Sequence, residues 1–186
     1  MEYSVIHAFI AGVVVLMSLL VHEFGHALTA KFFGAKPIVT LEAFGGYASY
    51  QSEMVTPKQR FIITLNGPLF QSFLILTSYL LLREHVFQNE FIQFFLLITL
   101  RINIIWVLLN LLPVHPLDGG QMVSHLLERK FGAKGHRISI LLGIICVVIT
   151  APILYIQGFH FFSILLAFLG VQNYQRLSLV PKIAKG

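Results

Sequence analysis

Long apolar runs separated by short polar connections constrain this chain more than any other feature of its sequence. A helix needs about 20 mostly apolar residues to cross a bilayer, and four of the runs are that long. Only 11% of the residues are charged, against about 25% in an ordinary soluble domain. The sequence therefore predicts an all-α polytopic membrane protein with about five transmembrane helices, at residues 4–30, 61–82, 91–112, 138–156 and from 159 onward.

The Lys and Arg residues are unevenly distributed among the connections. Residues 31–60 and 129–137 hold four each and the C-terminal tail holds three, whereas residues 83–90 hold one. Because cytoplasmic loops carry the excess of Lys and Arg, we expect the N-terminus outside and the C-terminus in the cytoplasm, most simply at a bacterial cytoplasmic membrane. These basic residues lie in loops rather than among stacked aromatic side chains, so the lipid bilayer is an expected partner and nucleic acid is not.

The domain organisation is predicted to be simple. The sequence has no internal repeat and no long soluble segment, which favours one membrane-embedded domain over residues 1–186, with a core at about 4–130 and additional helices at about 138–175. Two β-prone runs, 37–41 and 46–50, lie on either side of a Gly-Gly pair. This pattern is typical of a hairpin, so we expect a small membrane-associated β-hairpin after the first helix.

The motif H-E-x-x-H lies at residues 22–26, in the last third of the first apolar run. Positions i and i+4 share one face of a helix, so His22 and His26 can offer two imidazoles to one metal ion, with Glu23 beside them. The alternative is a pair of polar-facing helix residues near a membrane surface. Ionisable residues in an apolar helix are costly without a partner, so we interpret the motif as a zinc site near the cytoplasmic end of the helix.

A catalytic zinc usually has three protein ligands and keeps a fourth position for water. Residues 110–120 include two prolines and two glycines, so we expect an irregular segment there, with a helix resuming at 121–128 and a basic loop at 129–137. The predicted topology puts this segment at the depth of the H-E-x-x-H motif. Asp118, the only aspartate of the chain, is therefore the expected third ligand, and His115 is the second candidate.

The second apolar run carries Asn66-Gly67-Pro68 near its cytoplasmic end, at the same predicted depth. A proline within a membrane helix frees a carbonyl group, which neighbouring groups must satisfy. Helical spacing puts Gln71 on the face of Pro68, and we expect that face to meet protein rather than lipid.

These residues predict a hydrolytic mechanism. Zinc lowers the pKa of a water molecule that it binds, and Glu23 is positioned to accept a proton from that water and return it to a leaving amine. Asn110 is the expected donor to the oxyanion of the tetrahedral intermediate. Alternatively, Asn110 caps the irregular segment that follows it.

Together, H-E-x-x-H at residues 22–26 and N-x-x-P-x-x-x-L-D-G at 110–119 resemble the site-2 protease family of intramembrane zinc metalloproteases, peptidase M50. Residues 44–46, F-G-G, and 67–69, G-P-L, resemble family segments in the same order. The resemblance covers about residues 10–130. Within the family, the sequence most resembles the branch that contains the bacterial sporulation protease acting on a membrane-tethered pro-sigma factor.

The resemblance implies an intramembrane zinc endopeptidase that cleaves membrane-tethered proteins in an extended conformation near the cytoplasmic face. It implies one Zn²⁺ ion and a catalytic set made up of the metal ligands His22, His26 and Asp118, the general base Glu23, and Asn110. It also implies that Gly45 and Gly46 lie near the substrate, and we expect Asn66 to bind substrate as well. The edge of the predicted hairpin would receive such a substrate by strand addition.

The chain departs from the family pattern in having five predicted spans, one fewer than the common six-span form. It has no room for a PDZ or a CBS domain, so regulation by either is not expected, and regulatory partners would be other membrane proteins. Two other interpretations remain at this stage: another H-E-x-x-H membrane enzyme, such as a prenyl-protein protease, or a membrane binding protein without activity, for example a metal carrier.

Overall fold

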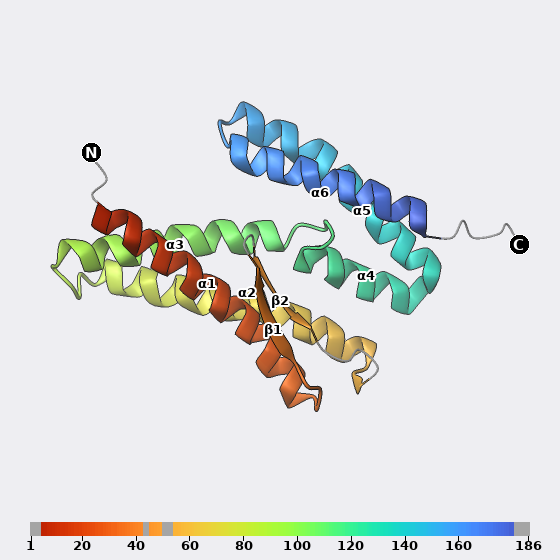
Figure 1. Ribbon diagram of the computed structural model, residues 1–186, viewed down its shortest axis with the longest axis horizontal. Helices are drawn as coiled ribbons and strands as arrows, with labels where there is room; N and C mark the ends of the chain where they lie inside the picture. The colour runs from red at the N-terminus through yellow and green to blue at the C-terminus, as the bar shows by residue number, and fades with distance from the viewer. Residues whose placement is uncertain (1–4, 43–44, 50–53, 181–186) are drawn as a thin grey trace, which may run out of the picture. The chain divides into compact units, whose positions relative to one another are not determined.

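The computed structural model describes residues 5–42, 45–49 and 54–180 (Figure 1). The chain falls into two compact units, residues 1–109 and 110–186, and each is described by itself. That the two units form one membrane-embedded domain stays a prediction. Over the described residues the elements are α1 (Val5–Phe32), β1 (Ile38–Glu42), β2 (Gly45–Ser49), α2 (Pro57–Arg83), α3 (Glu90–Asn110), α4 (Asp118–Phe131), α5 (Ala133–Ile156) and α6 (His160–Leu179).

Four of the helices, α1, α2, α3 and α5, are long and apolar enough to cross a membrane, among the residues that the structure describes. They correspond to the four long apolar runs of the sequence. The fifth run forms α6, which has 20 residues but is not one of these four candidate spans. The reason is composition, because the second half of α6 carries the polar residues Gln172, Asn173, Gln175 and Arg176.

In the first unit, α1 packs against α2 at a point where two glycines allow close approach. A Cβ atom on Gly25 of α1 would lie 2.9 Å from the carbonyl carbon of Asn66 and would overlap its oxygen. The start of α2 is fixed by a capping box, in which the Thr56 amide donates to the Gln59 side chain (2.7 Å) and the Gln59 amide donates to Thr56 Oγ1 (3.3 Å). The capping box fixes where α2 begins, and Gly25 allows the α2 backbone to approach α1 at Asn66.

The hairpin segment and α3 complete the first unit. Strands β1 and β2 pair antiparallel, from Ile38 opposite Ser49 to Glu42 opposite Gly45, and both contact α1. Helix α3 is connected to α1 by a buried hydrogen bond from Asn103 Nδ2 to Ser18 Oγ (2.9 Å). Residue 44 of the predicted F-G-G segment lies outside the described residues.

In the second unit, α5 packs against both α4 and α6. Figure 1 shows α5 and α6 side by side, joined by a short turn at Gly158. A Cβ on Gly170 of α6 would lie 2.8 Å from Cγ1 of Val147 on α5, so the two helices are in close contact there. The buried apolar residues of this unit are Val114, Val147, Ala151, Leu166 and Leu169.

The structure corrects two boundaries in this unit. Helix α4 begins at Asp118 rather than at 121, and Gly119 and Gly120 lie in its first turn. Cβ atoms on these glycines would overlap the Leu111 and Leu112 carbonyl groups and lie 2.6 Å from the His115 amide, so the glycines allow close packing rather than ending a helix. The predicted basic loop at 129–137 is also wrong, because only Gly132, with φ +57°, separates α4 from α5.

Candidate metal centre

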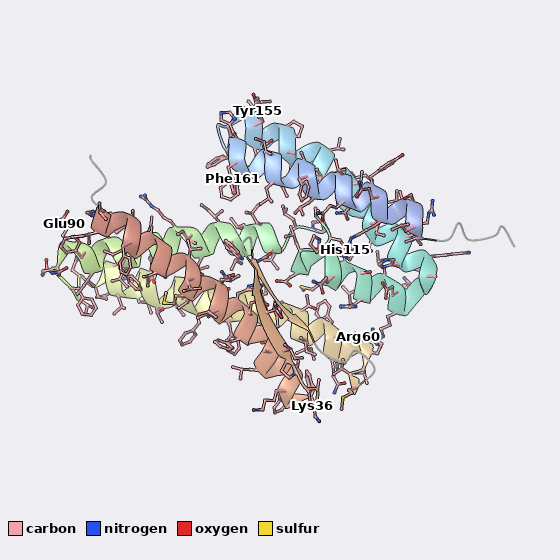
Figure 2. All side chains as sticks on the ribbon, in the orientation of Figure 1. Lys36, Arg60, Glu90, His115, Tyr155 and Phe161 are labelled. Atoms are coloured by element: carbon pink, nitrogen blue, oxygen red, sulfur yellow. The ribbon has the colours of Figure 1, made fainter. Side chains whose placement is uncertain are left out.

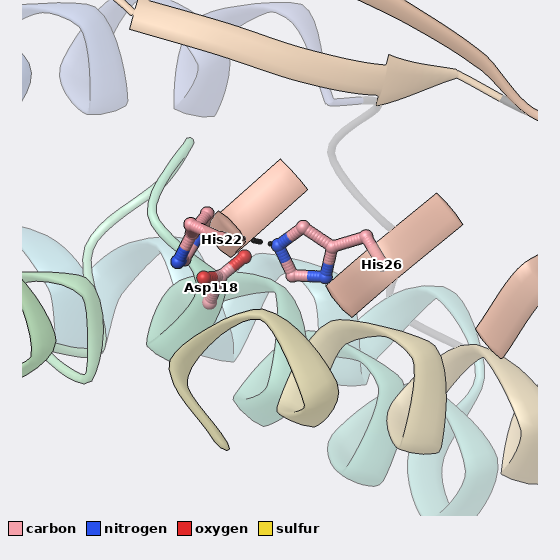
Figure 3. Close-up of side chains that lie close together, drawn as sticks. All are labelled: His22, His26 and Asp118. Atoms are coloured by element: carbon pink, nitrogen blue, oxygen red, sulfur yellow. Dashed lines mark hydrogen bonds between the residues drawn. The ribbon is translucent and has the colours of Figure 1, made fainter. Parts of the chain in front are cut away.

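Helix α1 buries both histidines of the H-E-x-x-H motif on one side. His22 and His26 are 4% and 8% exposed, and Glu23 is 4% exposed. Because the two imidazoles are one helical turn apart, their Nε2 atoms approach to 3.1 Å, the contact drawn as a dashed line in Figure 3. The motif therefore presents two nitrogen atoms to the same point.

The other ring nitrogen of each histidine has a partner on α2. His26 Nδ1 lies 2.8 Å from the backbone carbonyl oxygen of Ile63, and His22 Nδ1 lies 3.1 Å from Gln71 Oε1. The Ile63 carbonyl can only accept, so His26 donates from Nδ1, and the Gln71 oxygen favours the same arrangement for His22. In that arrangement the Nε2 atoms of both rings can bind one cation. The donor set thus fits a metal ion, and Ile63 and Gln71 orient the ligands.

Gly67 of α2 makes room for these rings. A Cβ atom on Gly67 would overlap the His26 imidazole and lie 3.0 Å from His22 Cε1. The neighbouring Asn66 donates from Nδ2 to the Ile62 carbonyl of its own helix (2.9 Å). The Asn66-Gly67-Pro68 segment therefore lies beside the histidines in the first unit. The expected role of Asn66 in substrate binding stays a prediction.

Asp118, the first residue of α4, is buried. It belongs to the second unit, and its role as the third ligand beside His22 and His26 of the first unit stays a prediction. Two imidazoles and one carboxylate are a donor set that suits Zn²⁺. The Nε2 atom of His115, the second candidate from the sequence, lies 3.3 Å from Ser139 Oγ within the second unit.

The remaining residues predicted for the site lie at the ends of elements. Asn110 is the last residue of α3 and is partly buried, and Gly45 and Gly46 begin β2. Their roles stay predictions. The residues that sequence reasoning did not assign to the site are Ile63 and Gln71. The spacing that puts Gln71 on the face of Pro68 was the available signal for one of them.

The chain matches the model of peptidase family M50 over residues 9–88 and 80–150. It is 28% identical over 165 residues to Stage IV sporulation protein FB of Bacillus subtilis. This match covers 86% of the chain and 56% of that protein. It is 35% identical over 124 residues to the putative zinc metalloprotease Rip3 of Mycobacterium tuberculosis, covering 65% of the chain and 32% of that protein. The chain thus spans about half, or less, of the length of these relatives.

Among solved structures, the fold is similar to that of a site-2 protease from Methanocaldococcus jannaschii. The TM-score is 0.64 at 20% sequence identity, over 95% of this chain and 81% of the other. The apolar helices and the paired histidines define a multi-pass membrane protein with a candidate metal centre. The family match over most of its length identifies it further: the chain belongs to peptidase family M50.

Proposed function

We propose that this chain is a zinc-dependent intramembrane endopeptidase of the site-2 protease type, which hydrolyses peptide bonds in membrane-tethered proteins. The observation that carries the proposal is the pair of buried imidazoles on α1. Their Nε2 atoms face each other, and their Nδ1 atoms are held by α2. This arrangement occurs in a chain of family M50 that has four candidate membrane spans.

His22, His26 and Asp118 would hold one zinc ion, in line with the names of the zinc metalloprotease relatives. When bound, zinc supplies Lewis acidity, which activates water and polarises a peptide carbonyl. Glu23 accepts the proton of the attacking water at its carboxylate and returns it to the leaving amine. Its burial beside the two histidines excludes bulk water, which strengthens these electrostatic interactions.

The other predicted site residues are assigned roles in binding. Asn110 donates a hydrogen bond to the developing oxyanion. Gly45 and Gly46, which begin β2, and Asn66 contact the substrate chain. Because β2 belongs to a two-stranded antiparallel sheet, an extended substrate would add to the edge of that sheet through backbone hydrogen bonds.

The membrane orientation follows the distribution of Lys and Arg. We propose that the protein lies in a bacterial cytoplasmic membrane, with the N-terminus outside, the C-terminus in the cytoplasm and the site near the cytoplasmic side. The substrate is then a protein whose tether brings an extended segment to that face. Regulatory membrane proteins are the expected partners.

The proposal is tested with the full chain reconstituted in liposomes together with candidate membrane-tethered substrates. Glu23→Gln should abolish cleavage while zinc content stays equal to wild type, because the amide cannot accept the proton. Glu84→Gln, a change at a residue exposed to solvent, is the matched control and should cleave normally. Cleavage by Glu23→Gln at the wild-type rate would contradict the mechanism.

A further inference from the structure

The irregular segment between α3 and α4 is held by a single side chain of α6. Asn173 Oδ1 accepts a hydrogen bond from the His115 backbone amide (3.3 Å), and Asn173 Nδ2 donates to the His115 backbone carbonyl (2.6 Å). Asn173 is fully buried and His115 is 5% exposed (His115 is labelled in Figure 2). One amide group therefore satisfies both polar groups of a residue that is 58 positions away.

The side chain of His115 is held from a second direction. Its Nε2 lies 3.3 Å from Ser139 Oγ on α5, and Ser139 Oγ donates to Ser124 Oγ on α4 (3.2 Å). Nearby, Gly143 of α5 lets the Pro113 carbonyl approach, because a Cβ there would lie 2.8 Å from that oxygen. The segment is thus fixed against α4, α5 and α6, and Asn173 is its contact from α6.

The position of Asp118 depends on this segment. The Leu117 amide donates to the Val114 carbonyl (2.9 Å), and the Gln121 amide donates to the Leu117 carbonyl (3.1 Å), so the segment leads directly into the first turn of α4. Gly119 and Gly120 pack that turn against the segment without any intervening side chain. A shift of the His115 peptide would therefore move the residue that begins α4.

We propose that Asn173 is a positioning residue for the metal centre: it fixes the His115 peptide so that α4 presents Asp118 in one orientation. The inference rests on the proposed role of Asp118 as a metal ligand. Asparagine suits this contact, since its planar amide offers donors and an acceptor side by side on a short side chain. A buried polar residue within an apolar helix is costly unless it has such partners. Leaving the buried amide and carbonyl groups of His115 unpaired would add a further cost in free energy.

The test measures zinc affinity by chelator competition on the purified full chain in detergent, together with hydrogen exchange of residues 111–118 in zinc-free protein. Asn173→Leu fills the same space without either hydrogen bond. We expect at least about tenfold weaker zinc binding, the usual loss when a group behind a metal ligand is removed, and faster exchange in this segment. Asn173→Asp keeps the acceptor but, as a carboxylate, loses the donor, and should give an intermediate loss.

Ser163→Ala is the matched control, because Ser163 of α6 also makes a buried hydrogen bond, but to the Ala151 carbonyl of α5 (2.7 Å). It should lower stability and leave zinc affinity within about twofold of wild type. Wild-type zinc affinity in Asn173→Leu, or an equal loss in Ser163→Ala, would overturn the inference. If Asn173→Leu does not fold, Asn173→Ser, whose hydroxyl cannot bridge both His115 groups, gives the same comparison.

The two proposals fail separately in this design. A wild-type chain that binds zinc but cleaves no substrate would contradict the proposed function and leave the role of Asn173 intact. A chain that cleaves normally after Asn173→Leu, with unchanged zinc affinity, would contradict the role of Asn173 alone.

Discussion

The imidazole of His26 on α1 donates its Nδ1 proton to the backbone carbonyl of Ile63 on α2, 2.8 Å away. A backbone carbonyl cannot donate, so this contact fixes both the tautomer and the orientation of the ring. Ile63 is five residues before Pro68, and no side-chain change can remove its carbonyl group. The structure therefore leaves His26 Nε2 as the atom available for a metal ion.

Gln71 performs the same function for His22, but through a side chain that can be changed. Gln71→Leu should weaken zinc binding about 10–100-fold, because it removes the acceptor that holds His22 Nδ1. Gln71→Glu keeps an acceptor oxygen and should retain most of the affinity. Chelator competition on the purified protein measures both.

Ser72→Ala is the control for that experiment. Ser72 lies on the same helix and donates only to the carbonyl of Pro68 within it (2.9 Å), as far as the described residues show. It should bind zinc like wild type. Equal affinities for Gln71→Leu and Ser72→Ala would show that Gln71 does not orient the ligand.

Gly67→Ala should disrupt the centre by steric overlap. The added methyl group would occupy space taken by the His26 ring and approach His22 Cε1 to 3.0 Å, so both imidazoles would have to move. We expect loss of zinc binding and a destabilisation of about 1–3 kcal/mol, the usual range for an overpacked site. Gly12→Ala on α1, where an added Cβ has no described atom within 4 Å, should leave the zinc content unchanged and should not lower the melting temperature, because alanine favours a helix interior over glycine.

Asp118→Ala tests the third ligand. Zinc content measured by atomic emission should fall well below one ion per chain, and added zinc should no longer raise the melting temperature, because a ligand that binds the folded state stabilises it by RT ln(1 + [L]/Kd). Glu128→Ala changes another carboxylate of the same helix, which contacts His136 and Ser124 instead. If the two variants hold equal amounts of zinc, Asp118 is not a ligand.

Local patterns in the sequence were sufficient for part of this architecture. The apolar runs predicted the four candidate spans, and the i, i+4 spacing of His22 and His26 predicted a shared helical face. The start of α4 at Asp118 was missed, because Gly119 and Gly120 normally indicate a break. Here a glycine at position 119 lets the first turn of α4 pack closely against the Leu111 and Leu112 carbonyl groups. No local sequence pattern predicts such a contact.

The residues behind the site were harder to predict for a related reason. Gln71 is 49 positions from His22, and Asn173 is 58 positions from His115. A polar residue in an apolar helix signals that some partner exists, but the partner is chosen by how the helices pack. The sequence thus indicated that Gln71 faces protein and left its partner open.

The stability of the fold should depend on pH through His115. Burial, with a further contribution from the Arg176 charge, lowers the pKa of His115 from 6.5 to about 4. His136, His125 and Glu128 are the other ionisable groups that act on it. Between pH 6.5 and 4 the unfolded chain binds a proton that the folded chain does not, so this contribution to stability is lost as the pH falls. The full effect is roughly 3 kcal/mol.

His115→Gln removes this titration, so its melting temperature in detergent should fall less than that of the wild type between pH 7 and pH 5. His160→Gln, at an exposed position at the start of α6, serves as the control and should follow the wild-type slope. Parallel curves for wild type and His115→Gln would mean that the His115 ring stays protonated, or becomes so at no cost, inside the fold. That result would contradict a His115 pKa lowered by burial.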